Sequence, residues 1–276
     1  MPKRFSTARG REFGDGVRAA LSATGMSARE ICEKIDWDPG KLSDLLNGKG
    51  GCSEVDLAIL LSFCRIVPAE RDHLLSVFRK TDVKDWWQQH GDHQPMLPRT
   101  WFEHLKKAKK FTSWNPLLVH GLLQLPDYAR AVIAAGANAP SDEVEQRVAA
   151  RMAMQEVFRQ RLDSTFYIHE QALLLPVGGV DVLKDQLHHL LRMWVRPYIT
   201  IRIVPSAVGA HPGFGGAFDL MTFDRYEPTV FWDTENSTLI VEAAASVKAH
   251  VQVLKSLDRI ALDAEESRGR IEELAG

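Results

Sequence analysis

The fold of this chain is decided first by residues 26–48, whose sequence is MSAREICEKIDWDPGKLSDLLNG. Ser27 and Glu30 have the spacing of a capping box, which predicts the start of a short helix. Asp38 is a favourable N-cap and Pro39 a favourable first residue for a second short helix. Two short helices joined by a tight turn predict a helix-turn-helix arrangement.

Apolar residues keep a helical spacing on both sides of this stretch, and no segment before residue 85 alternates as a strand does. We predict five helices, at about 11–23, 28–35, 39–46, 54–64 and from Pro68 onward. Further along, a polar stretch with glycine and two prolines predicts a linker, which we place at 86–98. Residues 1–85 are therefore expected to form an all-α domain, followed by a second domain at 99–276.

The second domain mixes helices with strands. Four segments have the composition and spacing of strands, at about 165–169, 199–204, 217–223 and 229–232. Helices are expected at about 100–110, 115–123, 126–135, 142–162, 180–194, 242–262 and 265–274. We therefore expect an α+β domain in which helices cover about four strands.

The predicted third helix has an apolar face and a polar face. Leu42, Leu45 and Leu46 are expected to face the core. An α-helix fits the major groove of DNA, so the opposite face can contact base edges. That face carries Gly40, Lys41, Ser43, Asp44 and Asn47. A helical bundle with an ordinary solvated face would show the same pattern, and the spacing alone leaves both interpretations open.

Basic residues near these helices are candidates for phosphate contacts. Arg29 stands near the start of the second helix and Lys49 follows the third. Lys3, Arg4 and Arg9 belong to a basic N-terminal arm, although a solvated, frayed terminus would have the same composition. A protein that contacts one half-site with each such unit is expected to be a homodimer on a double-stranded DNA operator.

The composition is that of a globular protein, with 45% hydrophobic and 25% charged residues and a formal net charge of −2. No apolar run is long enough to span a bilayer, and the basic start lacks the apolar segment of a signal peptide. The three cysteines form no metal-binding or disulfide pattern. We therefore expect a cytoplasmic protein that associates with the nucleoid when bound to DNA, and no membrane contact.

Residues 11–78 resemble the XRE family of helix-turn-helix proteins, the Cro and phage-repressor type. The order and spacing of 26–35, 37–43 and 47–49 carry this resemblance. It implies sequence-specific DNA binding. Two positions depart from the family's pattern: Ala28 stands where glutamine is usual, and Asp44 where arginine is frequent. Both departures remove DNA contacts that many relatives make, so the base preference does not carry over.

The second domain resembles a regulatory domain common in actinobacterial XRE regulators, including WhiJ-like and antitoxin-like proteins. The blocks that carry this resemblance are 118–131, 169–173, 176–178, 186–187, 201–205 and 209–211, in the same order. The resemblance implies a regulator that is often paired with a small BldB-like protein. The chemistry of such effector domains is not settled.

The glycine-rich stretch 209–216 is either a plain connecting loop or a mobile loop that binds a ligand or partner. We name Arg202, His211 and Trp232 as candidates for effector or partner binding. Residues 98–276 show no nucleophile–base pair and no metal-ligand cluster, so we expect no catalysis, no metal and no cofactor.

Three functions remain to be compared. The first is a transcriptional regulator controlled through its second domain by a small partner protein or a small molecule. The second is an antitoxin-like protein that mainly binds a small partner protein and uses DNA binding for autoregulation. The third, an enzyme with an appended DNA-binding module, has the least support because a catalytic residue set is missing from the sequence pattern.

Overall fold

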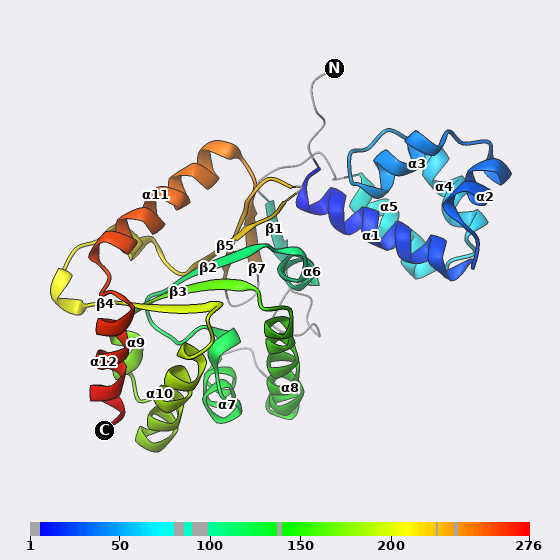
Figure 1. Ribbon diagram of the computed structural model, residues 1–276. Helices are drawn as coiled ribbons and strands as arrows, with labels where there is room; N and C mark the ends of the chain where they lie inside the picture. Colours follow the sequence, from blue (N-terminus) through cyan, green and yellow to red (C-terminus); the bar gives the residue numbers. More distant parts are fainter. Residues whose placement is uncertain (1–5, 80–85, 90–98, 137–139, 225, 235–236) are drawn as a thin grey trace. The chain divides into compact units, whose positions relative to one another are not determined.

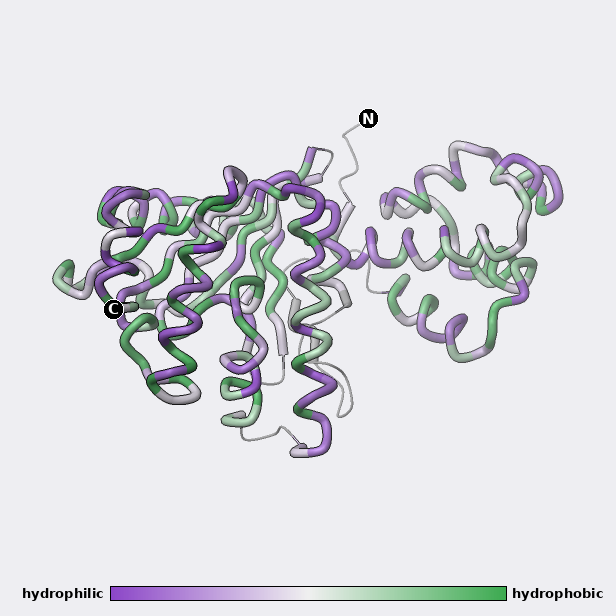
Figure 2. The backbone as a smooth tube through the Cα atoms, turned by 60° about the horizontal axis from the view of Figure 1, so that its bottom comes forward, coloured by the Kyte–Doolittle hydropathy of each residue, from purple (hydrophilic) through white to green (hydrophobic). Residues whose placement is uncertain are grey.

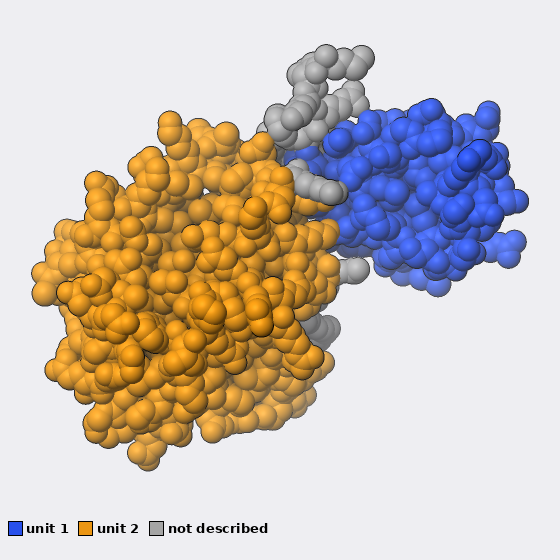
Figure 3. Space-filling view, in the orientation of Figure 1, with its two compact units in different colours: residues 1–86 blue, residues 87–276 orange. Residues whose placement is uncertain are grey.

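The computed structural model describes residues 6–79, 86–89, 99–136, 140–224, 226–234 and 237–276. The chain forms two compact units, residues 1–86 and 87–276, which are described separately (Figure 3). Strand β1 (Trp86–Gln89) occupies the start of the predicted linker, and the remainder of that linker lies outside the described residues.

The N-terminal unit contains the five predicted helices. Their bounds are α1 (Ala8–Ala23), α2 (Ala28–Ile35), α3 (Pro39–Leu46), α4 (Glu54–Phe63) and α5 (Pro68–Phe78). Ser27 and Glu30 make the predicted capping box of α2. Helix α1 begins earlier than predicted, because the Thr7 side chain accepts a hydrogen bond from the backbone N–H of Gly10 at 3.0 Å. Local capping therefore sets where these short helices begin.

Close backbone contact joins α1 to the segment that ends α3. A Cβ atom on Gly14 would collide with the carbonyl oxygen of Leu46, and one on Gly10 would lie 2.5 Å from the carbonyl oxygen of Gly48. Glycine at these positions lets the two backbones touch. The core beneath is apolar, and its buried members include Phe13, Val17, Ile31, Leu42, Leu45, Leu57, Leu61 and Leu74. The polar side of α3 is left at the surface.

The second unit is built on one mixed sheet with the strand order β1-β7-β6-β5-β2-β3-β4. The strands beyond β1 are β2 (Lys110–Asn115), β3 (Asp163–His169), β4 (Ile199–Val204), β5 (Phe218–Thr222), β6 (Thr229–Asp233) and β7 (Ser237–Val241). Strands β2, β3 and β4 are parallel, whereas β2, β5, β6 and β7 pair antiparallel in that order.

Helices cover both faces of the sheet (Figure 1). Helix α11 lies on one face, and α7, α8 and α10 lie on the other. Figure 2 shows hydrophobic residues concentrated along the strands, with hydrophobic and hydrophilic residues alternating along the helices. The helix bounds are α6 (Arg99–Lys107), α7 (Pro126–Ala134), α8 (Val144–Met154), α9 (Gln171–Leu174), α10 (Val180–Trp194), α11 (Ala244–Ile260) and α12 (Ala264–Ala275).

Short 3₁₀ turns connect these elements within the described ranges. They are η1 (Gly121–Leu123), η2 (Ser141–Glu143), η3 (Gln155–Gln160), η4 (Ser206–Val208) and η5 (Pro212–Gly215). In the described ranges, no helix has both the length and the apolar character that crossing a membrane requires.

The α+β class of this unit is confirmed, but the expectation of about four strands is wrong, because the described part of residues 99–276 contains six. Strands β2 and β7 were missed, and residues 115–123 form no α-helix. Strand β2 lies between β3 and β5 and buries five of its six residues, so its sequence does not alternate. Several of its buried residues are polar, which hides it further: Thr112, Ser113 and Asn115.

The glycine-rich stretch 209–216 packs against buried aromatic residues. The carbonyl oxygen of Gly213 accepts a hydrogen bond from Trp114 Nε1 at 2.8 Å. A Cβ atom on Gly213 would lie 2.6 Å from the ring of Trp114, which is completely buried. At least this part of the loop is therefore packed against the sheet.

We expect Gly213→Ala to lower the free energy of unfolding by about 1–3 kcal/mol, because the added methyl group overpacks the Trp114 ring. Gly269→Ala on α12 is a matched control, since nothing lies within 4 Å of its added Cβ. That change should stabilise the chain by about 0.5–1 kcal/mol, because alanine favours a helix more than glycine does. Thermal unfolding of both variants measures the difference, and equal midpoints would contradict the packing of this loop.

Candidate nucleic-acid interface and effector pocket

The start of α3 is fixed by Asp38. Its Oδ1 atom accepts hydrogen bonds from the backbone N–H groups of Gly40 at 2.8 Å and Lys41 at 3.2 Å. A Cβ atom on Gly40 would lie 2.7 Å from the same oxygen. Glycine at this position therefore fits the cap itself, a reason that the sequence analysis did not give. Gly40 and Ser43 are exposed on the predicted DNA-facing side.

The side chain of Lys41 is bound by residues of its own domain. Its Nζ atom lies 2.9 Å from Asp56 Oδ2 and 4.3 Å from the centre of the Trp37 ring. Hydrogen bonds from the Ser53 backbone, then from Lys41, lower the pKa of Asp56 to about 2. Asp56 is therefore ionised at neutral pH, and Lys41 must exchange this partner for DNA if it contacts the duplex.

The other predicted contact residues of this unit carry local partners at the surface. Asn47 Nδ2 donates to the carbonyl oxygen of Ser43 at 2.7 Å, within the last turn of α3. Lys49 Nζ lies 3.8 Å from Asp44 Oδ1, and Arg29 Nε lies 3.1 Å from Glu33 Oε1. These exposed pairs are weak and easily exchanged. Their side chains can therefore exchange these partners for phosphate groups.

Only part of the predicted basic arm lies in the described residues. Lys3 and Arg4 lie outside the described residues. Arg9 lies in the first turn of α1 rather than in an extended arm, because α1 begins at Ala8.

The three predicted effector residues each have a separate hydrogen-bond partner. Arg202 on β4 donates to backbone carbonyl groups at the end of α11, including that of Ala261 at 3.0 Å, and so caps this helix. His211 Nδ1 accepts from the backbone N–H of Gly213 at 3.1 Å. Trp232 Nε1 donates to His250 Nε2 at 2.8 Å. Each side chain thus stabilises the fold where it stands, and none lines the pocket described next.

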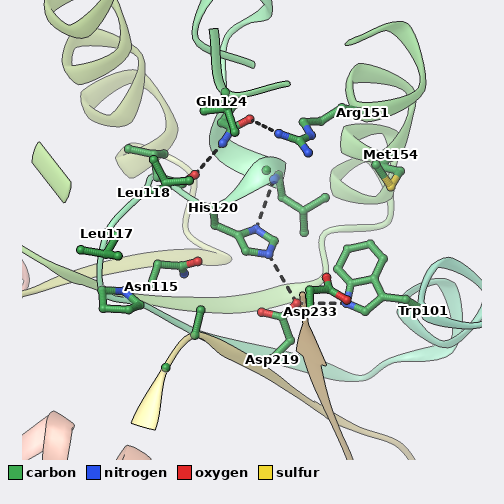
Figure 4. Close-up of a pocket in the computed structure, with 17 residues that line it drawn as sticks. Trp101, Asn115, Leu117, Leu118, His120, Gln124, Arg151, Met154, Asp219 and Asp233 are labelled. Carbon is green, nitrogen blue, oxygen red and sulfur yellow. Dashed lines mark hydrogen bonds and ion pairs between the residues drawn. The ribbon is translucent and has the colours of Figure 1, made fainter. Parts of the chain in front are cut away.

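A pocket of about 440 Å³ lies over the sheet, between the segment 115–124 and α8 (Figure 4). Its walls are mostly apolar, and they include Trp101, Leu117, Leu118, Leu122, Val132 and Met154. Leu117 and Leu118 are 59% and 37% exposed, so apolar side chains also reach the solvent here. The polar groups in the pocket are Asn115, His120, Gln124, Arg151, Asp219 and Asp233. A mostly apolar cavity with a few converging polar groups is typical of small-molecule sites.

The carboxyl group of Asp219 is the centre of the polar network. It accepts from Trp101 Nε1 at 3.0 Å and from Ser113 Oγ at 2.6 Å. His120 Nε2 lies 3.4 Å away, and the dashed lines in Figure 4 mark this contact. His120 Nδ1 accepts from the backbone N–H of Leu122 at 3.1 Å, so Nε2 is the nitrogen that carries the proton toward Asp219. Asp219 thereby ties α6, β2 and the segment before η1 to β5.

Asp233 shares this face of the sheet. Asp219 on β5 pairs with Phe231 on β6, and the two-residue period of a strand brings Asp233 to the same side. Its Oδ1 atom accepts from Thr238 Oγ1 at 2.5 Å. The residue as a whole is exposed, but protein atoms surround its carboxyl group, and Asp219 adds a like charge. Burial and then this charge raise the pKa of Asp233 to about 6.

Glutamine side chains fasten the segment that forms the pocket wall. Gln124 Nε2 donates to the carbonyl oxygen of Val119 at 2.7 Å, and its Oε1 accepts from Arg151 Nη1 at 2.9 Å. Gln155 and Gln186 donate to further backbone carbonyls here, each at 2.7 Å. Burial lowers the pKa of Arg151. The wall is therefore held in place by buried hydrogen bonds rather than by α-helix.

The polar residues of this pocket were not predicted from the sequence as site residues. His120 and Gln124 stood inside the block 118–131, but neither was named as a candidate for effector or partner binding. Asp219 stands between Phe218 and Leu220 in a buried strand, and a carboxylate in such a place needs partners. That was a usable signal for Asp219. The sequence carries no comparable signal for Asp233.

Each of the two units matches a known family of domains. Residues 12–74 match the model of a helix-turn-helix domain. Residues 99–273, more than half of the chain, match the model of a domain of unknown function, DUF5753. The chain belongs to the DUF5753 family. The pocket lies entirely within the DUF5753 domain, and the helix-turn-helix match supports a DNA-binding regulator. No curated protein and no solved structure gives a significant match.

We expect Asp233→Asn to raise the unfolding midpoint at pH 8 but not near pH 4. The folded chain disfavours the ionised carboxylate, because the pKa is raised from 3.8 to about 6. This destabilisation is fully present above the raised pKa and absent below the ordinary one, and asparagine removes it. Allowing for screening by solvent, the gain at pH 8 is about 1 kcal/mol, or about 2–4 °C.

Calorimetry at both pH values measures this effect. Asp185→Asn on α10, an exposed position, is the control and should leave the midpoint unchanged. A gain of the same size at both pH values would show that the raised pKa of Asp233 is not the cause.

Proposed function

We propose that this protein is a sequence-specific transcriptional regulator whose DUF5753 domain controls DNA binding. The observation that carries the proposal is the pair α2 and α3, capped at Ser27 and Asp38, with an exposed polar face on α3. A helix presented in this way can enter the major groove. Within this proposal Ser43, Asn47 and Lys41 contact bases, and Arg29 and Lys49 contact phosphates.

Control through the second domain requires a ligand or partner that binds the DNA-competent and incompetent forms with different affinity. The pocket of about 440 Å³ supports a small-molecule effector. A small BldB-like partner protein is the other effector that the resemblance to WhiJ-like and antitoxin-like actinobacterial XRE regulators implies. We infer that the domain performs no catalysis and that the protein acts on DNA in the cytoplasm.

The direct test is selection of binding sites from random double-stranded DNA by the full-length protein. We expect one enriched sequence. Lys41→Ala should weaken binding to it by about 1–3 kcal/mol if Lys41 contacts a base edge. Asp56→Asn removes the carboxylate that holds Lys41 and should strengthen binding. Fluorescence anisotropy at fixed salt measures both variants.

Asp72→Asn is the matched control for Asp56→Asn, because Asp72 is an exposed acid on α5 and pairs with Arg71 rather than with Lys41. Equal gains from the two changes would mean that charge alone matters and that Lys41 has no special role. Failure to enrich any sequence would contradict sequence-specific regulation.

We also expect a homodimer, because two half-sites give a dimer more affinity and specificity than one. Light scattering of the full-length protein at micromolar concentration should give twice the chain mass of 31.0 kDa. The same measurement with the selected DNA should show two chains on each duplex. A mass of one chain under both conditions would contradict this expectation.

A further inference from the structure

The ionisable groups that line the pocket carry more negative than positive charge. Asp219 and Asp233 are acids, Arg151 is the only cation of the Lys or Arg type among the described residues of its lining, and His120 uses its Nδ1 lone pair on a backbone N–H group. Around these groups the walls are apolar. A ligand that fits this pocket therefore has an apolar body and carries a positively charged group.

The carboxyl groups of Asp219 and Asp233 differ in how many hydrogen-bond donors they have. Asp219 faces three donors, from Trp101, Ser113 and His120. For Asp233, Thr238 is the one donor that the described residues show. A carboxylate can accept about four hydrogen bonds. Asp233 therefore retains acceptor capacity on the side of the pocket.

We propose that this pocket binds a protonated amine carried on an apolar skeleton, with the ammonium group against the carboxylate of Asp233. The apolar skeleton fills the space between Trp101, Leu122 and Met154. The proposal rests on the proposed role of the DUF5753 domain as the control element, and it names the chemical class of the effector.

Placing an ammonium group in an apolar pocket is unfavourable unless it is paired. Asp233 supplies the opposite charge, and the amine in turn compensates the unfavourable desolvation that raises the pKa of this carboxyl group to about 6. Alkylamines are protonated well above neutral pH, as lysine is. At neutral pH, therefore, both partners of the pair are charged.

An anionic ligand on Arg151 is the alternative. It is less favoured because Arg151 Nη1 already donates to Gln124 Oε1, and the two carboxyl groups of the pocket would repel a second anion. Preference for an anionic probe would support this alternative.

The experiment uses full-length protein and two matched sets of probes. One set is 1-adamantylamine, 1-adamantanol and 1-adamantanecarboxylate; the other is 2-phenylethylamine, 2-phenylethanol and 3-phenylpropionate. Calorimetric titration at pH 7.5 should show the amine of at least one set binding about tenfold more tightly than its alcohol, because a hydrogen bond between charged groups is added. The carboxylate of that set should bind most weakly.

Variants locate the amine. Asp233→Asn should reduce the affinity of the amine to that of the alcohol and leave the alcohol unchanged. Asp185→Asn, outside the pocket, should keep the tenfold advantage. The advantage should also fall as the pH is lowered through 6, where Asp233 takes up a proton. Other ionisable or polar groups also face Asp233: Asp219 on β5, His120 before η1, Arg151 on α8 and Thr238 on β7. The pH series is therefore repeated on Asp233→Asn, which separates the titration of Asp233 from theirs.

Equal binding of amine and alcohol in both sets, preference for a carboxylate, binding of none of the six probes, or an amine advantage that survives Asp233→Asn would each overturn the proposal. Preference for a carboxylate would assign the site to Arg151 instead. DNA binding by the same preparation, measured without probe, separates this failure from failure of the proposed function. If the selected DNA still binds, only the ligand class is wrong.

Discussion

The second unit depends on the buried carboxyl group of Asp219. Trp101 from α6 and Ser113 from β2 donate to it, and His120 contacts it, although these residues lie far from Asp219 in the chain. A buried carboxylate is very unfavourable unless such donors surround it. The same interactions fix the segment 115–124 above the sheet, so the group that completes the fold also shapes the pocket. Loss of one donor would therefore disturb both.

A different constraint organises the N-terminal unit. Glycine at positions 10 and 14 lets the backbone of α1 touch the end of α3 and the residue Gly48 just after it, which fixes α3 without using its outer face. The polar residues of that face are therefore left at the surface. Lys41 is held there by Asp56 and the Trp37 ring. Contact with DNA must compete with this ion pair, which lowers the net contribution of Lys41 to the free energy of DNA binding.

The pocket and the blocks that resemble a regulatory domain coincide in part. Block 118–131 supplies His120, Gln124 and several apolar residues of the wall. By contrast, block 201–205 contains Arg202, which caps α11, and block 209–211 contains His211, which packs near Trp114. A sequence block that matches the family therefore does not tell a residue that lines the pocket from a residue that stabilises the fold. Only the contacts of each side chain do so.

The sequence alone determined the five N-terminal helices, including the bounds of α2 and α3, because capping acts within three or four residues. It also indicated the α+β class of the second domain. The tertiary structure decided the rest. Strand β2 is a strand because β3 and β5 pair with it, and its buried serine and asparagine carry no strand signal. Likewise Asp233 reaches the pocket through the register of β5 and β6, and its pKa depends on Asp219, fourteen positions away in the chain. Contacts of this kind arise from strand pairing between distant segments, which no local pattern records.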